Sequence, residues 1–245
     1  MFSNFFNNFL ENIDSKFKNE LYELSKIDGG SIDEMKIYLN TEYWRPHMSV
    51  FDYIELHKFH KDSKILDIGT WFGILPWVFN NYGFKNVDCS DWTIDNSRLN
   101  FILKKINVNP FYLNIQPYKK LNLNNKYDLI LLQYASFHWK DDIIAWSFGS
   151  HFDPNMQELI YNWKGQIKDE TGTPWNFFFP WRYNEWKFFI EDLKEYLLPN
   201  GLAIIGPRPY MYNIWQDKFK KELDLFKQHK ILKFDKLNSQ IIIKK

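Results

Sequence analysis

From residue 64 onward, short apolar runs alternate with amphipathic segments, and this alternation limits the possible fold more than any other feature of the chain. The runs "KILDIG" (64–69), "KNVDCSD" (85–91) and "YDLILLQY" (127–134) are typical of buried strands, and "PFYLNI" (110–115) is expected to be a further strand, the third of the four along the chain. Helical patterns follow the first two runs over residues 74–83 and 93–107. Because strand–helix–strand crossovers are right-handed, repeated units of this kind build a parallel sheet with helices on both faces.

The last third of the chain indicates how the sheet ends. A helical pattern over residues 184–197 leads through the turn Pro199–Gly201 into a strand over 202–206. The last two strands, 230–237 and 240–245, are joined by so short a turn that they must run antiparallel. We therefore expect an α/β fold with a mostly parallel sheet and an antiparallel C-terminal strand.

The N-terminal segment has a different, helical pattern. Apolar residues recur at three- and four-residue steps over 5–27, which predicts a helix there. Pro46 is expected to break the chain before a further helix over 48–60, because proline removes a backbone donor. These helices are expected to cover the sheet as an N-terminal cap.

Domain organisation follows from the same patterns. The chain has no internal repeat and no low-complexity linker, and its 245 residues can bury one sizeable core. We expect a single domain over 1–245, made of the helical cap (1–62) and the sheet core (63–245). An aromatic-rich insert over 138–186 is expected to interrupt the core after the fourth strand.

Composition excludes several partners. The chain carries 31 basic and 30 acidic residues, a net charge of +1, whereas a nucleic-acid-binding face needs a clustered basic excess. No run approaches the ~18 apolar residues of a membrane span. The opening "MFSNFFNNFL" lacks the features of a secretion signal, and the lone Cys89 fits a reducing compartment. We expect a cytoplasmic protein that binds neither membrane nor nucleic acid.

The turn after the first strand combines an acid with glycines. Asp67 lies near the strand's end, and Gly69 and Gly73 would let the backbone approach a ligand closely. A carboxylate there suits a hydroxyl or ammonium group, because it would repel a phosphate. Asp91 ends the second strand, where ribose diols are bound, and Trp92 could lie against a base. The expected ligand has a ribose, a base and a cationic end.

Four segments together resemble a known family. "ILDIGTWFG", "GFKNVDCSD", "YDLILLQYASFHW" and "LLPNGLAIIGP" are similar to the successive motifs of class I S-adenosylmethionine-dependent methyltransferases, over about residues 60–245. The resemblance implies a Rossmann-like, seven-stranded sheet and S-adenosylmethionine as cofactor. By position it places these residues at the cofactor: Asp67, Gly69, Thr70, Trp71 and Gly73 around the methionine part, Asp91 on the ribose, Trp92 at the adenine, and Gln133 and Tyr134 beside the methyl group.

The sequence departs from the family pattern at two places. The family usually has a glycine where this chain has Trp71, and often an acid after the third strand, where this chain has Asn114 and Gln116. A dehydrogenase is the rival interpretation, but "GTWFGI" lacks the G-x-G-x-x-G spacing that its fingerprint needs. A Rossmann-like fold that binds nothing is the other alternative.

Two histidines are candidate general bases for methyl transfer. His138 follows the fourth strand, close to the expected methyl group, and His151 is the second candidate. The alternatives are a loop-supporting role for His138 and a surface position for His151. Asp141 and Asp142 could orient a histidine or cap a helix, and no residue spacing is diagnostic of a metal site, so none is expected.

The substrate-binding residues are expected in two aromatic segments. Arg182 and Tyr183 lie in "GTPWNFFFPWRYNEW", whose rings could stack on a sugar or form a buried subdomain or homodimer contact. Tyr43 and Arg45 could fold over the cofactor or pack before a helix. We expect O-methylation of a small polar molecule, a sugar or nucleotide-activated sugar for a surface polysaccharide such as capsule. The alternatives are N- or O-methylation of another metabolite and a non-catalytic cofactor-binding partner protein.

Overall fold

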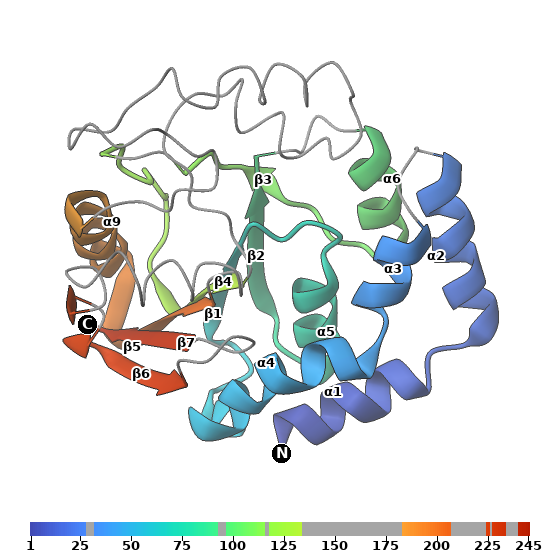
Figure 1. The fold of residues 1–245 in the computed structure, drawn as a ribbon, viewed down its shortest axis with the longest axis horizontal. Coiled ribbons are helices and arrows are strands. Elements are labelled where there is room, and N and C mark those ends of the chain that lie inside the picture. Colours follow the sequence, from blue (N-terminus) through green and yellow to red (C-terminus); the bar gives the residue numbers. More distant parts are fainter. Residues whose placement is uncertain are drawn as a thin grey trace.

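The computed structural model describes residues 1–27, 32–92, 97–115, 118–133, 183–206, 224–225, 227–233 and 240–245 (Figure 1). Four helices precede the first strand, and the later ones alternate with strands. The helices are α1 (Phe2–Glu11), α2 (Ser15–Ile27), α3 (Ile32–Tyr38), α4 (Thr41–Tyr53), the 3-10 turn η1 (Leu56–Lys58), α5 (Ile74–Tyr82), α6 (Ser97–Lys105) and α9 (Tyr183–Glu195). None of the helices within these ranges is long and apolar enough to cross a membrane.

The described strands form one sheet in the order β3-β2-β1-β4-β5-β7-β6. Strands β1 to β5 are mutually parallel, and β7 runs antiparallel to both neighbours. The predicted α/β, mostly parallel sheet with antiparallel C-terminal pairing is therefore confirmed. The strands are β1 (Lys64–Ile68), β2 (Asn86–Asp91), β3 (Phe111–Tyr112), β4 (Tyr127–Gln133), β5 (Leu197–Gly206), β6 (Lys230–Lys233) and β7 (Gln240–Lys244).

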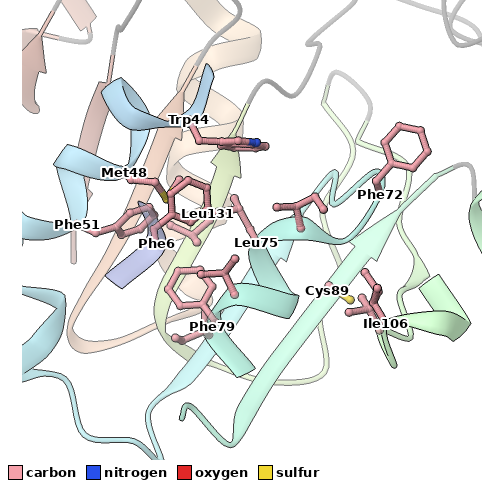
Figure 2. Close-up of a cluster of buried hydrophobic side chains, with 14 of the residues drawn as sticks. Phe6, Trp44, Met48, Phe51, Phe72, Leu75, Phe79, Cys89, Ile106 and Leu131 are labelled. Atoms are coloured by element: carbon pink, nitrogen blue, oxygen red, sulfur yellow. The ribbon is translucent and has the colours of Figure 1, made fainter. Parts of the chain in front are cut away.

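Each face of the sheet packs against a different group of helices. Side chains alternate between the faces, so that Ile65, Leu129 and Leu131 join one core with α1, α4 and α5. The intervening Leu66 and Ile130 join a second core with α9. Figure 2 shows side chains of α4, α5 and β4 meeting in the first of these cores. The N-terminal helices thus close one face of the sheet.

Helix α1 is held on this face by aromatic packing. The Phe2 ring is fully buried, stacks on Phe79 of α5 at 5.4 Å between centroids, and meets Phe51 of α4 edge-on at 5.2 Å. Phe6 and Leu10 repeat the pattern one and two turns later, and both are fully buried. Aromatic rings supply large buried areas, so α1 is part of the core that supports the sheet.

Two expectations for the N-terminal segment were wrong. Residues 5–27 form two helices, because α1 ends at Glu11 and α2 begins at Ser15. Pro46 lies inside α4 and does not break it. The buried side chains Trp44 and Met48 lie on either side of Pro46, and their packing holds the helix through the residue whose backbone N–H is missing.

The predicted turn at Pro199–Gly201 lies within a strand. Tyr127 of β4 pairs with Leu197, and the next paired residues are Leu129 and Leu202, so the intervening residues bulge out of β5. Asn200 takes a left-handed conformation, φ 66°, which asparagine tolerates better than most residues. The turn residues therefore shape a bulge, and α9 ends before it, at Glu195.

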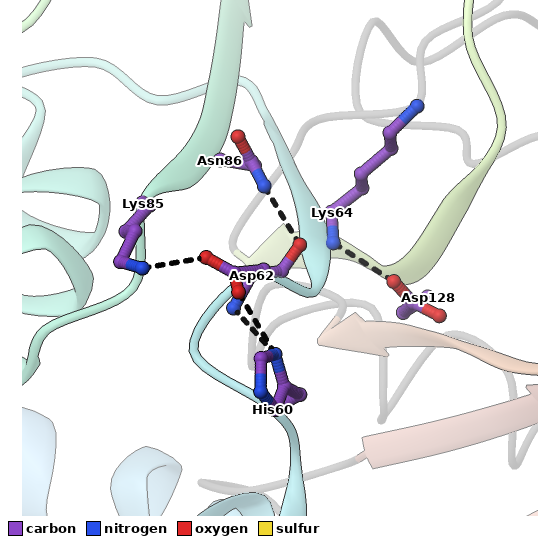
Figure 3. Close-up of polar contacts among 6 residues, drawn as sticks. All are labelled: His60, Asp62, Lys64, Lys85, Asn86 and Asp128. Atoms are coloured by element: carbon purple, nitrogen blue, oxygen red, sulfur yellow. Dashed lines mark hydrogen bonds and ion pairs between the residues drawn. The ribbon is translucent and has the colours of Figure 1, made fainter.

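The amino edge of the sheet is polar and exposed. Asp62 pairs with Lys85 at 2.9 Å, and its carbonyl accepts a hydrogen bond from Asn86 Nδ2 (Figure 3). The backbone N–H of Lys64 donates to Asp128 Oδ2 at 2.8 Å. Such exposed pairs contribute little to stability, since water screens them.

We predict that Phe2→Ala lowers the free energy of unfolding by about 3–5 kcal/mol, because it removes a fully buried ring from the core beneath the sheet. Phe101→Ala is the matched control, since that ring is 57% exposed, and its effect should stay within about 0.5 kcal/mol. Urea unfolding measures both. Equal effects would show that α1 does not belong to the core.

Candidate functional site at the carboxyl edge of the sheet

Two successive rows of side chains distinguish the carboxyl edge of the sheet. Strand pairing places Asp67 of β1 level with Cys89 of β2 and Leu131 of β4, and Leu131 level with Ile204 of β5. Apart from Asp67, this row is apolar and belongs to the core under α4 and α5. The next row on the same face is polar or glycine throughout: Asp91, Gly69, Gln133, Gly206 and Gln240. The change from apolar to polar marks where the core ends.

Asp67 is a carboxyl group buried in an apolar row. Its side chain is only 2% exposed. Burial raises the pKa of Asp67 to about 7, and the neighbouring negative charge of Asp91 acts in the same direction. A cation placed beside Asp67 would stabilise its ionised form, so this position favours a positively charged ligand group.

The turn after β1 is tied to the end of β2 by three hydrogen bonds. The backbone N–H groups of Gly69 and Thr70 both donate to the Ser90 carbonyl, at 2.8 and 3.0 Å. The N–H of Trp71 donates to Asp91 Oδ2 at 2.8 Å. These bonds hold the Asp91 carboxylate against the turn, and Asp91 itself is only 3% exposed.

Trp71 takes a left-handed backbone conformation, which favours glycine. Its φ is 48°, in the left-handed region, which costs a non-glycine residue about 1–2 kcal/mol. The hydrogen bond to Asp91 and an edge contact of the indole with Phe72, 5.3 Å between centroids, hold it there. The departure at Trp71 therefore leaves a left-handed turn in place.

Gly73 closes the turn and begins α5. Its φ is 73°, and its N–H donates to the Thr70 carbonyl at 2.8 Å. A Cβ there would lie 2.6 Å from Leu103 Cδ2 and 3.1 Å from Val108 Cγ1. Only glycine satisfies both the backbone conformation and this close packing.

The end of β4 holds a buried polar cluster. Gln133 and Gln240 exchange two side-chain hydrogen bonds, at 3.1 and 3.2 Å, and Gln240 Nε2 lies 3.4 Å from His47 Nδ1 of α4. Burial lowers the pKa of His47 from 6.5 to about 4. Sequence analysis singled out Gln133 but neither His47 nor Gln240. The buried face of α4 and the polar first residue of an apolar strand were the available signals.

The other predicted site residues divide into two groups. Trp92 follows Asp91 and is half-buried, and Tyr43 is half-buried with its ring centroid 6.3 Å from that of His47. Arg45 is exposed and pairs with Glu42 at 2.7 Å. Outside the described residues lie Tyr134, His138, His151 and Arg182, and the side chain of Tyr183 is not described either. The roles assigned to these residues stay predictions.

No group of three His, Cys, Asp or Glu side chains in the described ranges is placed to hold a metal ion. The charge of Asp91 lies close enough to Asp67 to raise its pKa, but among the described residues no third such ligand joins these two acids.

No protein-family model matches the chain, and no curated protein matches its sequence. Solved structures of similar fold include an S-adenosylmethionine-dependent methyltransferase from Clostridium acetobutylicum, 17% identical, with a TM-score of 0.39 over 68% of this chain and half of that one. A ribosomal protein L11 methylase from Lactobacillus delbrueckii subsp. bulgaricus is 14% identical, with a TM-score of 0.45 over 84% of this chain and 80% of that one.

A third structure is an amino pentose methyltransferase from Micromonospora echinaspora with S-adenosylmethionine bound. It is 14% identical, with a TM-score of 0.36 over 65% of this chain and 48% of that one. Likeness at these levels leaves the function of the chain to be inferred from its own residues.

We predict that two buried groups make the stability of the fold depend on pH in opposite directions. The folded pKa of Asp67, about 7, exceeds its ordinary 3.8, so its contribution falls as pH rises between these values. The folded pKa of His47, about 4, lies below its ordinary 6.5, so its contribution rises with pH between these values. In the parent chain the two slopes largely offset each other.

Asp67→Asn should therefore leave the effect of His47 on the pH dependence of the unfolding free energy without its opposing contribution. Between about pH 4.5 and 6.5, the unfolding free energy of the variant should rise relative to the parent by about 1.4 kcal/mol per pH unit. Urea unfolding at several pH values measures this, and His47→Asn should shift the slope in the opposite direction. Parallel curves for parent and variants would contradict the assignment.

Proposed function

We propose that the chain is an S-adenosylmethionine-dependent methyltransferase acting on a small polar molecule. The observation that carries the proposal is the pair of buried carboxylates, Asp67 and Asp91, at the tips of adjacent parallel strands, with a left-handed glycine turn tied between them. Ligands of open α/β sheets bind beyond these strand ends. The antiparallel β7 also fits the class I methyltransferase fold that the motifs resemble.

The chemistry of the site suits this cofactor. Asp67 is buried where a cation would favour its charged form, and the methionine end of the cofactor carries an ammonium group. Asp91 is a carboxylate at the position that accepts hydrogen bonds from a ribose diol, and Trp92 follows it beside the expected adenine. A carboxylate at Asp67, beside this turn, would repel a pyrophosphate.

The reaction requires alignment and, for a hydroxyl acceptor, a base. When bound, S-adenosylmethionine supplies a methyl group on a positively charged sulfur. The acceptor oxygen forms a bond to the methyl carbon as the carbon–sulfur bond breaks, and the sulfur keeps the electron pair. His138 receives the acceptor's proton in this proposal, with His151 as the second candidate.

The acceptor is proposed to be a sugar or nucleotide-activated sugar, in surface polysaccharide (capsule) biosynthesis. Arg182 could pair with a phosphate or carboxylate, and Tyr183 and Tyr43 could stack on or hydrogen-bond to a sugar. Arg45 is a further candidate contact, and it would have to break its ion pair with Glu42 to bind the ligand. A cytoplasmic location and a homodimer through the aromatic segment belong to the same proposal.

We predict that Asp91→Asn weakens S-adenosylmethionine binding at least about tenfold, because hydrogen bonds to a charged acceptor contribute about 1.5–3 kcal/mol. The asparagine oxygen can still accept from Trp71, so the turn should stay intact. Asp88→Asn is the matched control: the same substitution in β2, at an exposed residue bonded to the Tyr127 hydroxyl. Calorimetry that gave equal affinities for both variants would refute the assignment of Asp91.

For the base, His138→Ala should reduce turnover about 10²–10⁴-fold while leaving cofactor affinity unchanged. The acceptor would be the first active member of a panel of sugars and nucleotide sugars. His151→Ala, measured beside it, distinguishes the two candidates. Loss of cofactor affinity in His138→Ala would show a supporting role, and binding without turnover across the panel would favour a non-catalytic partner protein.

A further inference from the structure

A buried hydrogen-bonded relay joins three elements at the carboxyl edge. Gln133 ends β4, Gln240 begins β7, and His47 lies on α4, 193 residues before Gln240. All three side chains are at most 6% exposed. Buried polar groups of this kind are retained when they are hydrogen-bonded, and here each amide bonds the other.

Glycine makes the relay possible. Gly206 of β5 lies between β4 and β7, level with Gln133, and the two amides meet over it. A Cβ at Gly206 would overlap Gln133 Oε1 and lie 2.9 Å from Gln240 Nε2. No positive φ requires glycine at this position, so the space for the amide pair is the reason for it.

The hydrogen bonds of the relay leave one side-chain N–H of Gln133 unused. A primary amide has two N–H donors, and Gln240 uses both, one to Gln133 Oε1 and one to His47 Nδ1. His47 therefore accepts at Nδ1 and, when neutral, carries its proton on Nε2. Gln133 uses one donor, to Gln240 Oε1. Within the part of the chain that the structure describes, its second N–H has no partner.

The charges along the edge indicate what this N–H would bind. Asp91 places negative charge at the β2 end of the site, and the adjacent Asp67 of β1 becomes charged when a cation lies beside it, whereas the β4 to β7 end holds uncharged donors. The α-amino-acid end of a ligand is a zwitterion. Its ammonium group fits beside the acids, and its carboxylate needs a donor away from them, which the Gln133 amide is placed to supply.

We propose that His47 and Gln240 are positioning residues that hold the Gln133 amide so that its second N–H binds the carboxylate of the S-adenosyl ligand. This inference rests on the proposed function, because the ligand is the cofactor proposed above. It moves Gln133 from the methyl group, where the resemblance placed it, to the carboxylate of the ligand, and it gives His47 and Gln240 a role.

The test measures S-adenosylhomocysteine affinity by calorimetry at neutral pH in relay variants. His47→Asn keeps an acceptor oxygen where Nδ1 lies, so affinity should stay within about threefold of the parent. His47→Leu removes the acceptor and should weaken binding about tenfold, as the loss of one hydrogen bond to a charged group predicts. Gly206→Ala displaces the amides without removing a polar group and should weaken binding similarly.

If His47 had only a structural role, the S-adenosylhomocysteine affinities of the two His47 variants would follow a different order. Leucine suits a buried site at least as well as asparagine, so equal affinities for the two His47 variants, or a tighter-binding leucine variant, would overturn the proposal. Met48→Leu is the control, because it changes a buried α4 side chain and none of the relay bonds. Thermal unfolding confirms that each variant is folded.

Nitrogen NMR separates this inference from the proposed function. In the relay, His47 has an unprotonated Nδ1, and His47→Leu should shift the Gln133 side-chain N–H signals, which His47→Asn should restore. A parent chain that shows these signals but does not bind S-adenosylhomocysteine would refute the proposed function while leaving the relay itself intact. A protonated Nδ1 in the parent would refute the relay.

Discussion

Burial of the Asp67 carboxyl in an otherwise apolar row is the constraint on which the carboxyl edge depends. The row is closed by the N-terminal helices, whose aromatic side chains pack on the same face of the sheet. Without that cover, water would solvate Asp67 and its pKa would fall toward the ordinary value. The N-terminal cap therefore packs on the face of the sheet that carries Asp67 and is part of the apolar core beside that carboxyl.

The sheet changes from apolar core to polar site over two residues of each strand, between the row that contains Asp67 and the row that contains Asp91 and Gln133. Side chains that continue the apolar pattern would close the edge, but here carboxylate and amide groups alternate with glycine. Each glycine has a local function: Gly69 begins the turn tied to Ser90, and Gly206 makes room for two amides. The polar groups are consequently buried and held by hydrogen bonds, in contrast to the exposed ion pairs of the opposite edge.

Trp71 adopts a left-handed backbone conformation that usually requires glycine. The left-handed turn is kept at a cost in backbone strain, which the hydrogen bond to Asp91 and the indole packing offset. That hydrogen bond couples the turn to the carboxylate proposed to bind the ribose. The strained backbone at Trp71 is therefore held by the same carboxylate, Asp91, that is proposed to bind the ribose.

Within the described residues, the sequence by itself determined the order of strands and helices after residue 64 and the positions of Asp67 and Asp91 at strand ends, because apolar periodicity and turn residues are local properties. It did not determine the path of α4 through Pro46, where packing outweighed a local rule. Only the tertiary structure decided that His47 meets Gln240, since sheet register and helix packing bring together residues 193 positions apart. Long-range pairing leaves no periodic trace in a single chain, and so the relay could not be predicted from its sequence.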